Sequence, residues 1–183
     1  MTQKLNAQHI MNKPVVVLRE VESVGRVYDI LHSNNYQAFP IVDGYDSNNT
    51  EHFGTLKGLI LRHQILTLLK KKAFLNNSQL LKPDDFREFY PRYLKLKDIN
   101  IRDDERNYEL DLRPYMNLSP YSLTENSNLP RIFRLFRGLG LRHIIIVDLN
   151  NRVVGIVTRI DIAKYKAHIG LNHLKIRQLN VRV

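Results

Sequence analysis

Residues 144–161 have the sequence IIIVDLNNRVVGIVTRID, and this stretch carries the clearest structural pattern of the chain. Its two runs rich in β-branched residues, 144–147 and 153–157, predict two strands joined by a tight turn, and a helix is expected after them. The triplet Ile146-Val147-Asp148 repeats Ile41-Val42-Asp43 at an offset of 105, and Met116-Asn117 repeats Met11-Asn12 at the same offset. Self-similarity at one fixed offset indicates two copies of a single structural unit, which we call copy one and copy two.

Each copy begins with a short apolar stretch, at residues 15–18 or 121–123, which is expected to form its first strand, and continues with a helix that has one apolar face. Pro130, in the first helical turn after Ser127 or Asn128 as the N-cap, supports the helix of copy two. The apolar positions of these helices are Val21, Val24, Tyr28 and Leu31 in copy one, and Leu129, Ile132, Phe133 and Phe136 in copy two.

Two strands and a second helix complete each copy. The strands of copy one are predicted at residues 39–42 and 56–60, and the connection between them is longer than in copy two, which a hairpin tip tolerates. The apolar positions of the closing helices are Ile65, Leu66, Leu68 and Leu69 in copy one, and Ile160, Ile162 and Ala163 in copy two.

Each copy is therefore a β-α-β-β-α unit, and the predicted fold class is α+β. A three-stranded sheet with helices on one face leaves its other face bare, so we expect the two units to pack together in pseudo-two-fold symmetry. The linker between them is polar and too long for a structureless loop, and a short helix over residues 85–90 is expected in it. The predicted boundaries are 1–72 for the first domain, 73–109 for the linker, 110–170 for the second domain and 171–183 for a C-terminal tail.

The composition restricts the class of protein. A formal net charge of +10 suggests an anionic partner: nucleotide phosphate, an acidic lipid surface, nucleic acid or another domain. The chain contains no cysteine, which excludes disulfides and thiolate zinc sites. It has neither an apolar run long enough to span a bilayer nor the pattern of a signal peptide.

No catalytic motif is visible. The sequence has no Gly-x-Ser-x-Gly motif, no phosphate-cradling glycine loop and no convincing pair of carboxylates, and its seven histidines show no metal-ligand spacing. We therefore expect neither an enzyme nor a metal site.

The run GIVTRID at residues 155–161, within a repeated β-α-β-β-α unit, resembles the most recognisable part of a CBS domain, so the chain is similar to a tandem CBS domain pair. Three further runs resemble the cytoplasmic C-terminal region of eukaryotic CLC chloride channels and chloride/proton exchangers of the lysosomal and vacuolar branch. They are DFREFYPR at residues 85–92, MNLSPY at residues 116–121 and LFRGLGLRH at residues 135–143.

This resemblance covers residues 10 to about 166, and it implies a location and partners. The chain would lie at the cytoplasmic face of a lysosome, endosome or vacuole membrane. Its partners would be the transmembrane domain of the same parent chain, a second copy in a homodimer formed through the CBS domains, an adenine nucleotide and acidic membrane lipid.

The resemblance also implies a site for ATP, ADP or AMP between the two domains. Asp161 would accept hydrogen bonds from the ribose hydroxyls, Thr158 would offer a hydroxyl and Arg159 would meet phosphate. Adenine would stack on Tyr36, with backbone contacts at its edge. The implied nucleotide-binding residues are Val15, Tyr36, Gln37, Ala38, Thr158, Arg159 and Asp161.

Copy one departs from this pattern. It has LRHQ at residues 61–64 where copy two has TRID at residues 158–161, so the threonine and the aspartate are both missing. We therefore expect one nucleotide per chain. Val15 has no hydroxyl, which leaves the contacts with adenine to the backbone.

Plainer roles are open for the same residues. Asp161 could be only a stabilising acid at a helix N-terminus, and Tyr36 could pack in the core or a turn. Three arginines with a spacing of three could form a solvated helix face or contact acidic headgroups or a transmembrane domain. They are Arg131, Arg134 and Arg137.

The favoured function is a cytosolic regulatory domain of a CLC-type chloride channel or transporter, in which a nucleotide between two CBS domains shifts their arrangement and modulates anion transport. The alternative is a CBS scaffold that binds no nucleotide and serves dimer assembly and trafficking. A nucleic-acid-binding protein, suggested by the charge alone, ranks last because no motif supports it, and no nucleic-acid partner is expected.

Overall fold

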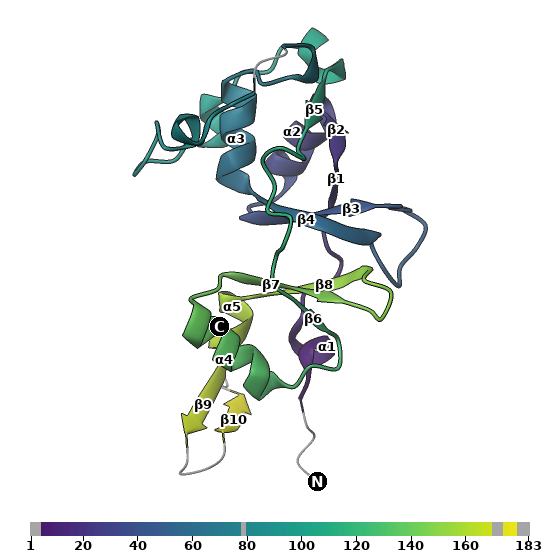
Figure 1. Ribbon diagram of the computed structural model, residues 1–183, viewed down its shortest axis with the longest axis vertical. Coiled ribbons are helices and arrows are strands. Elements are labelled where there is room, and N and C mark those ends of the chain that lie inside the picture. The colour runs from purple at the N-terminus through teal and green to yellow at the C-terminus, as the bar shows by residue number, and fades with distance from the viewer. Residues whose placement is uncertain (1–4, 78–79, 170–173, 179–183) are drawn as a thin grey trace. The chain divides into compact units, whose positions relative to one another are not determined.

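The computed structural model describes residues 5–77, 80–169 and 174–178 (Figure 1). The chain forms two compact units. The copy-two unit contains residues 1–15, 46–55 and 120–183, and the copy-one unit contains residues 16–45 and 56–119. The domain boundaries expected from the repeat divide the chain differently and stay a prediction. The expected C-terminal tail lies outside the described residues except for 174–178.

The copy-one unit is built on a three-stranded sheet in the order β1-β3-β4. The strands are β1 (Leu18–Arg19), β3 (Ala38–Asp43) and β4 (Thr55–Leu61). β1 runs parallel to β3, with Leu18 opposite Ile41. The helices α2 (Val24–Ser33) and α3 (Arg62–Lys70) lie on the same side of this sheet in Figure 1, and their apolar side chains share one core with it.

The first helix of this unit begins later than the apolar pattern predicts. Val21, expected on the helix, lies in β2 (Val21–Ser23). The reason is the cap: the Ser23 hydroxyl accepts a hydrogen bond from the backbone N–H of Arg26 at 3.2 Å, so α2 starts at Val24.

The copy-two unit repeats the same arrangement. Its sheet has the order β6-β7-β8, with β6 parallel and β8 antiparallel to β7, and it consists of β6 (Ser122–Thr124), β7 (His143–Val147) and β8 (Val153–Thr158). Helix α4 (Leu129–Leu139) begins after Asn128, whose side chain accepts from the N–H of Arg131 at 2.9 Å. The predicted apolar stripe of α4 is buried, and the two matching units confirm the α+β prediction.

The end of this unit differs from the expectation. Helix α5 (Arg159–Ala163) is short, and only Ile162 of its three predicted apolar positions is buried, whereas Ile160 is 75% exposed. Positions 160 and 162 point to opposite sides of a helix, so they cannot share one face. An antiparallel hairpin of β9 (Tyr165–Ile169) and β10 (Leu174–Gln178) follows, and no pattern in the sequence predicted it.

Each unit contains the segment that precedes the first strand of the other copy. We call this segment, which includes the Met-Asn pair, the leader. Helix α1 (Ala7–Ile10) buries Ala7 and Ile10 in the core of the copy-two unit, and the backbone of Asn12 exchanges hydrogen bonds with Ile156 of β8 at 2.8 and 3.4 Å. In the copy-one unit, Asn117 makes the matching exchange with Leu59 of β4 at 2.8 and 3.0 Å. There β5 (Glu109–Asp111) also pairs antiparallel with β2. The two Met-Asn pairs found by self-comparison are therefore the points where the leaders dock.

A glycine makes each docking possible. A Cβ added to Gly155 would overlap the Met11 side chain, and a Cβ added to Gly58 would lie 2.8 Å from the Sδ of Met116. Neither strand position has room for a Cβ, so each methionine packs directly on the strand backbone.

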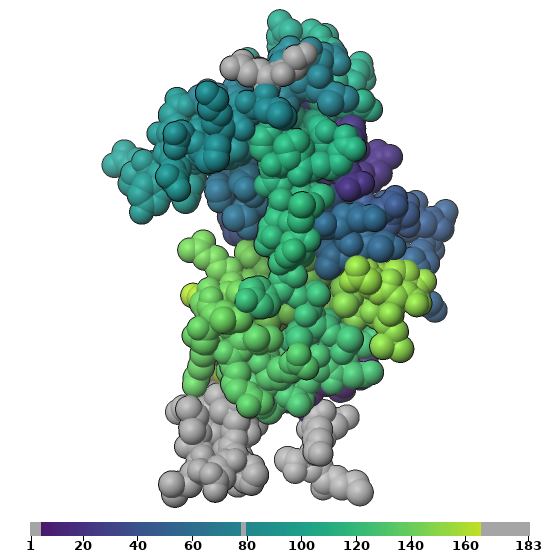
Figure 2. Space-filling model, in the orientation of Figure 1, coloured from purple at the N-terminus to yellow at the C-terminus, as the bar shows by residue number. Residues whose placement is uncertain are grey.

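The linker lies at the surface of the copy-one unit, where Figure 2 shows it in teal. It contains short 3-10 turns at Leu75–Asn77, Pro83–Phe86, Leu96–Asp98 and Asp104–Asn107. The helix predicted over residues 85–90 is wrong: the turn ends at Phe86.

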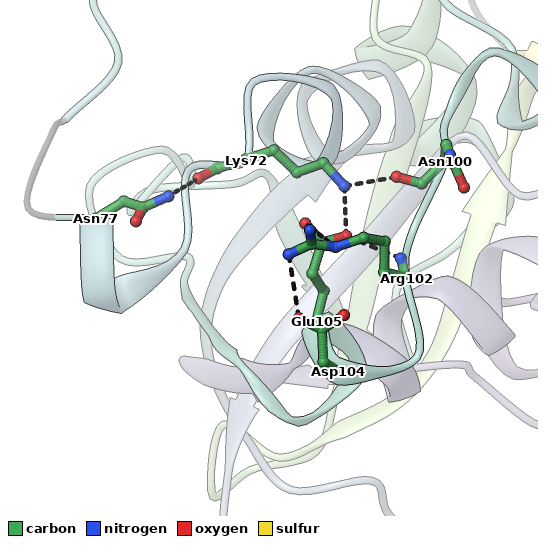
Figure 3. A network of polar contacts seen from close by, with 6 residues as sticks. All are labelled: Lys72, Asn77, Asn100, Arg102, Asp104 and Glu105. Carbon is green, nitrogen blue, oxygen red and sulfur yellow. Dashed lines mark hydrogen bonds and ion pairs between the residues drawn. The ribbon is translucent and has the colours of Figure 1, made fainter.

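A buried carboxylate ties the linker to the end of α3 (Figure 3). Lys72 Nζ donates to Glu105 Oε2 at 2.6 Å and to the Asn100 carbonyl at 2.5 Å, and the N–H of Arg102 donates to the same Glu105 oxygen at 2.8 Å. Hydrogen bonds from Lys72 and from the Arg102 backbone hold the pKa of Glu105, which is 6% exposed, below its usual range. The linker is therefore ordered by specific contacts.

None of the helices within the described ranges is long and apolar enough to cross a bilayer.

We expect Gly155→Ala to destabilise the chain by about 1–3 kcal/mol, because the new Cβ displaces the docked Met11. Gly138→Ala is the matched control, since a Cβ there meets nothing within 4 Å and a helix favours alanine by about 1 kcal/mol. Urea denaturation compares the two variants. If Gly155→Ala were as stable as Gly138→Ala, the packing of Met11 on Gly155 would contribute nothing to stability.

We also expect Glu105→Gln to loosen the linker. A carboxylate whose pKa is lowered by folding contributes stability above its ordinary value of 4.5, and this is lost as the pH falls through the lower folded pKa. At pH 7 the variant should therefore show smaller hydrogen-exchange protection factors than wild type at the amide of Tyr108, and the difference should shrink in acid. Asp104→Asn, which removes an exposed partner of Arg102, should leave protection unchanged.

Candidate functional site

The seven residues assigned from the sequence divide between the two compact units. Val15, Thr158, Arg159 and Asp161 belong to the copy-two unit. Tyr36, Gln37 and Ala38 belong to the copy-one unit.

Asp161 is the third residue of α5, and it is a buried carboxylate that is 4% exposed. Its Oδ2 accepts hydrogen bonds from the Thr158 backbone N–H at 2.8 Å, from the Thr158 hydroxyl at 2.7 Å and from Asn12 Nδ2 at 2.6 Å. The bond to the Thr158 backbone is the reciprocal cap of a helix N-terminus. Asp161 therefore has the plainer of its two expected roles, that of a stabilising acid at a helix N-terminus.

That role uses only one of the two carboxylate oxygens. Lys164 Nζ lies 3.7 Å from Oδ1, and within the described part of the chain no donor makes a hydrogen bond to Oδ1. An ionised carboxylate offers about four lone-pair positions. Oδ1 therefore retains the capacity to accept a hydroxyl group.

Arg159 is fixed at the C-terminal end of α4. Its Nε donates to the Leu141 carbonyl at 2.7 Å, and its Nη2 donates to the Gly140 carbonyl at 2.8 Å. These carbonyls lie where a helix leaves its last acceptors without partners. Since a guanidinium carries five N–H groups, it keeps donors for an anion while it holds this end of α4.

The copy-one unit keeps the arginine at a helix end and the side-chain cap, but it lacks the carboxylate. Arg62 donates to the carbonyls of Leu31 at 2.6 Å and Asn34 at 2.9 Å at the end of α2, as Arg159 does for α4. Gln64 Oε1 accepts from the N–H of Leu61 at 2.9 Å, which replaces the cap made by Asp161. The Gln64 amide nitrogen donates to the Tyr115 carbonyl at 3.3 Å. The single ribose site expected from the sequence stays a prediction.

The copy-one residues assigned to adenine lie just before and at the start of β3. Tyr36 is 55% exposed, so its ring is not part of the core. The Gln37 carbonyl accepts from the N–H of Arg62 at 2.9 Å, and Ala38 is buried. Val15 is also buried, and the strand expected to start there starts at Leu18 instead.

Asn12 and Lys164 approach the Asp161 carboxylate, and sequence reasoning assigned neither of them to the site. Asn12 was visible as a repeated residue, but its side-chain partner lies 149 residues away in sequence. Only the docked leader brings the two together. The described residues include no group of three or more histidine, aspartate or glutamate side chains that could hold a metal ion.

The strand beside the site carries a perturbed histidine. His143 of β7 is paired with Thr158 of β8. Burial lowers the pKa of His143 below its ordinary value of 6.5, and the positive charge of Arg142 lowers it further. The imidazole is therefore neutral at physiological pH.

We expect stability to decrease as the pH falls below 6.5 because of His143. A histidine whose pKa is lowered by folding contributes full stability above its unfolded pKa and loses it as the pH falls towards the folded value. The melting temperature of His143→Gln should therefore fall less between pH 7.5 and pH 5.5 than that of wild type. Parallel pH curves for the two proteins would contradict this.

Comparisons with known proteins give a family. The CBS domain family matches residues 7–71 and 111–168. The chain is 41% identical over 186 residues to the H(+)/Cl(-) exchange transporter 7 of Homo sapiens, covering 97% of this chain and 23% of that protein. It is 36% identical over 169 residues to chloride channel protein C of Dictyostelium discoideum, covering 88% of this chain and 22% of that protein. The chain thus spans less than a quarter of the length of these relatives.

A solved structure agrees in fold. The CBS domain protein PAE2072 from Pyrobaculum aerophilum, complexed with AMP, matches with a TM-score of 0.50 and 16% identity over 86% of this chain and 89% of that one. These relatives confirm the resemblance inferred from the runs at residues 85–92, 116–121 and 135–143. Because the family matches two segments that cover more than half of the chain, this protein belongs to the CBS domain family.

Proposed function

We propose that this chain is the cytosolic regulatory region of a CLC-type chloride channel or chloride/proton exchanger, and that an adenine nucleotide bound to it modulates anion transport. The observation that carries the proposal is the buried Asp161 carboxylate, which has one oxygen committed to structure and one still able to accept a hydroxyl. A buried charge of this kind is costly unless it is used for structure or binding. Here it is suited to both.

The relatives support the two halves of this proposal separately. The transport half rests on the name of the human relative, an H(+)/Cl(-) exchange transporter, of which this chain matches 23%. The nucleotide half rests on the CBS protein complexed with AMP, which has the same fold. The proposed location is the cytoplasmic face of a lysosomal, endosomal or vacuolar membrane.

The chemistry of the residues defines the proposed contacts. The ribose diol would donate to Asp161 Oδ1, and the guanidinium of Arg159 would offer its remaining N–H groups to phosphate. Tyr36 provides an exposed aromatic face for adenine, with the backbone of Gln37 and Ala38 beside it. A ligand that contacts residues of both units stabilises one arrangement of them over another, and this is how binding would influence transport.

The proposed partners are the transmembrane part of the parent chain, a second copy of this chain and acidic membrane lipid. Helix α4 supports the last of these. Arg131, Arg134 and Arg137 are exposed along it, and across the described ranges none of the three side chains is paired with a carboxylate. Anionic headgroups attract such a basic surface.

Thermal unfolding with AMP, ADP and ATP tests nucleotide binding. A ligand at a hundredfold excess over its dissociation constant adds about 2.7 kcal/mol, which raises the melting temperature of a chain of this size by roughly 5–10 °C. Tyr36→Leu should remove most of this shift by removing the stacking face. Tyr121→Leu is the matched control, because Tyr121 is 50% exposed and belongs to no assigned contact.

The alternative function gives the opposite result. A CBS scaffold that serves dimer assembly and trafficking would show no shift with any of the three nucleotides. A shift that Tyr36→Leu and Tyr121→Leu leave equally intact would place the nucleotide elsewhere on the chain. Either result would overturn the assigned site.

A further inference from the structure

We infer that Asn12 is a positioning residue of the nucleotide site: it orients the Asp161 carboxylate so that Oδ1 is presented to the ribose. This inference rests on the proposed function. The geometry behind it lies entirely within the copy-two unit. Its central observation is the hydrogen bond from Asn12 Nδ2 to Asp161 Oδ2 at 2.6 Å.

Asn12 is held firmly enough to act in this way. Its backbone is bonded to Ile156 in both directions, and the leader before it is anchored by the N–H groups of Ala7 and Gln8, which donate to the carbonyls of Ser127 and Glu125 at 2.8 and 3.0 Å. Ala7 is also completely buried. The Asn12 amide therefore approaches Asp161 from a fixed segment and not from a free end.

The direction of approach matters for the carboxylate. Both of the other donors to Oδ2 come from Thr158, so they restrain Asp161 from one residue only. Asn12 adds a third donor from a different segment, so Oδ2 is held from two directions. Without Asn12, only Thr158 holds Oδ2 and the carboxylate can turn about its bond to Cβ, so the diol loses a preorganised acceptor at Oδ1.

The repeat supplies a control for this residue. Asn117 docks its leader through the same backbone exchange with β4, but its Oδ1 accepts from the N–H of Ser119 at 3.0 Å. The residue that corresponds to Asp161 is Gln64, whose amide donates to Tyr115 instead. Asn117 thus shares the docking role of Asn12 and has no carboxylate to orient.

The test compares AMP with 2′,3′-dideoxy-AMP, which lacks the diol, by titration calorimetry of wild type, Asn12→Ala and Asn117→Ala. The Asn12 side chain is exposed, so its removal deletes little packing. We expect Asn12→Ala to weaken AMP about fivefold to tenfold, the typical effect of one net hydrogen bond, and to leave the dideoxy nucleotide unchanged. Asn117→Ala should alter neither affinity.

The ratio of the two affinities separates positioning from structure. If Asn12→Ala weakens both nucleotides equally, Asn12 only docks the leader and the inference is wrong, while the proposed function stands. If wild type binds neither nucleotide, the proposed function fails and the inference fails with it. Asn12→Leu, which keeps the size but removes the donor, should lose the same selectivity, and retention of the ratio in that variant would also overturn the inference.

Discussion

The close approach of a leader segment to the backbone of a strand is the constraint on which this chain depends. Met11 packs on β8 at Gly155, and Met116 packs on β4 at Gly58, in places where a Cβ has no room. The asparagine that follows each methionine then exchanges hydrogen bonds with the same strand. Each compact unit is therefore completed by residues that belong, in sequence, to the other copy. Each sheet is packed in part against a leader that is distant in sequence. A copy that folded alone would lose these contacts.

This exchange of leaders also shapes the candidate site. Asn12 reaches Asp161 only because the leader is docked on β8, and the resulting bond is part of the environment of a buried carboxylate. One oxygen of that carboxylate completes the N-terminus of α5, and the other remains able to accept a hydroxyl. Structure and proposed binding are thus combined in one side chain. A change at Asp161 affects the helix as well as any ligand, so its neighbours are the better probes of binding.

The two copies show how a fold keeps a structural role while it loses a chemical one. Arg62 and Arg159 both bind the carbonyls at the end of a helix, and Gln64 makes the cap that Asp161 makes in the other unit. An amide satisfies that backbone N–H as well as a carboxylate does, but it carries no charge and accepts through one oxygen only. At this position the copies therefore differ in charge and in the number of acceptor oxygens, which are properties that a ligand would recognise.

The sequence by itself determined the repeat, the order of its elements and the buried stripe of α4, because hydrophobic periodicity and caps such as Asn128 act over a few residues. It also identified Asp161, through its place in a recognisable run of residues. It failed where a local pattern was short: α5 was too brief to form one apolar face, and the linker formed only a 3-10 turn that ends at Phe86 where a helix over 85–90 was expected. Only the tertiary structure decided which leader completes which unit, and that Asn12 meets Asp161. That contact joins residues 149 positions apart, and no local pattern records a partner that packing alone brings within reach.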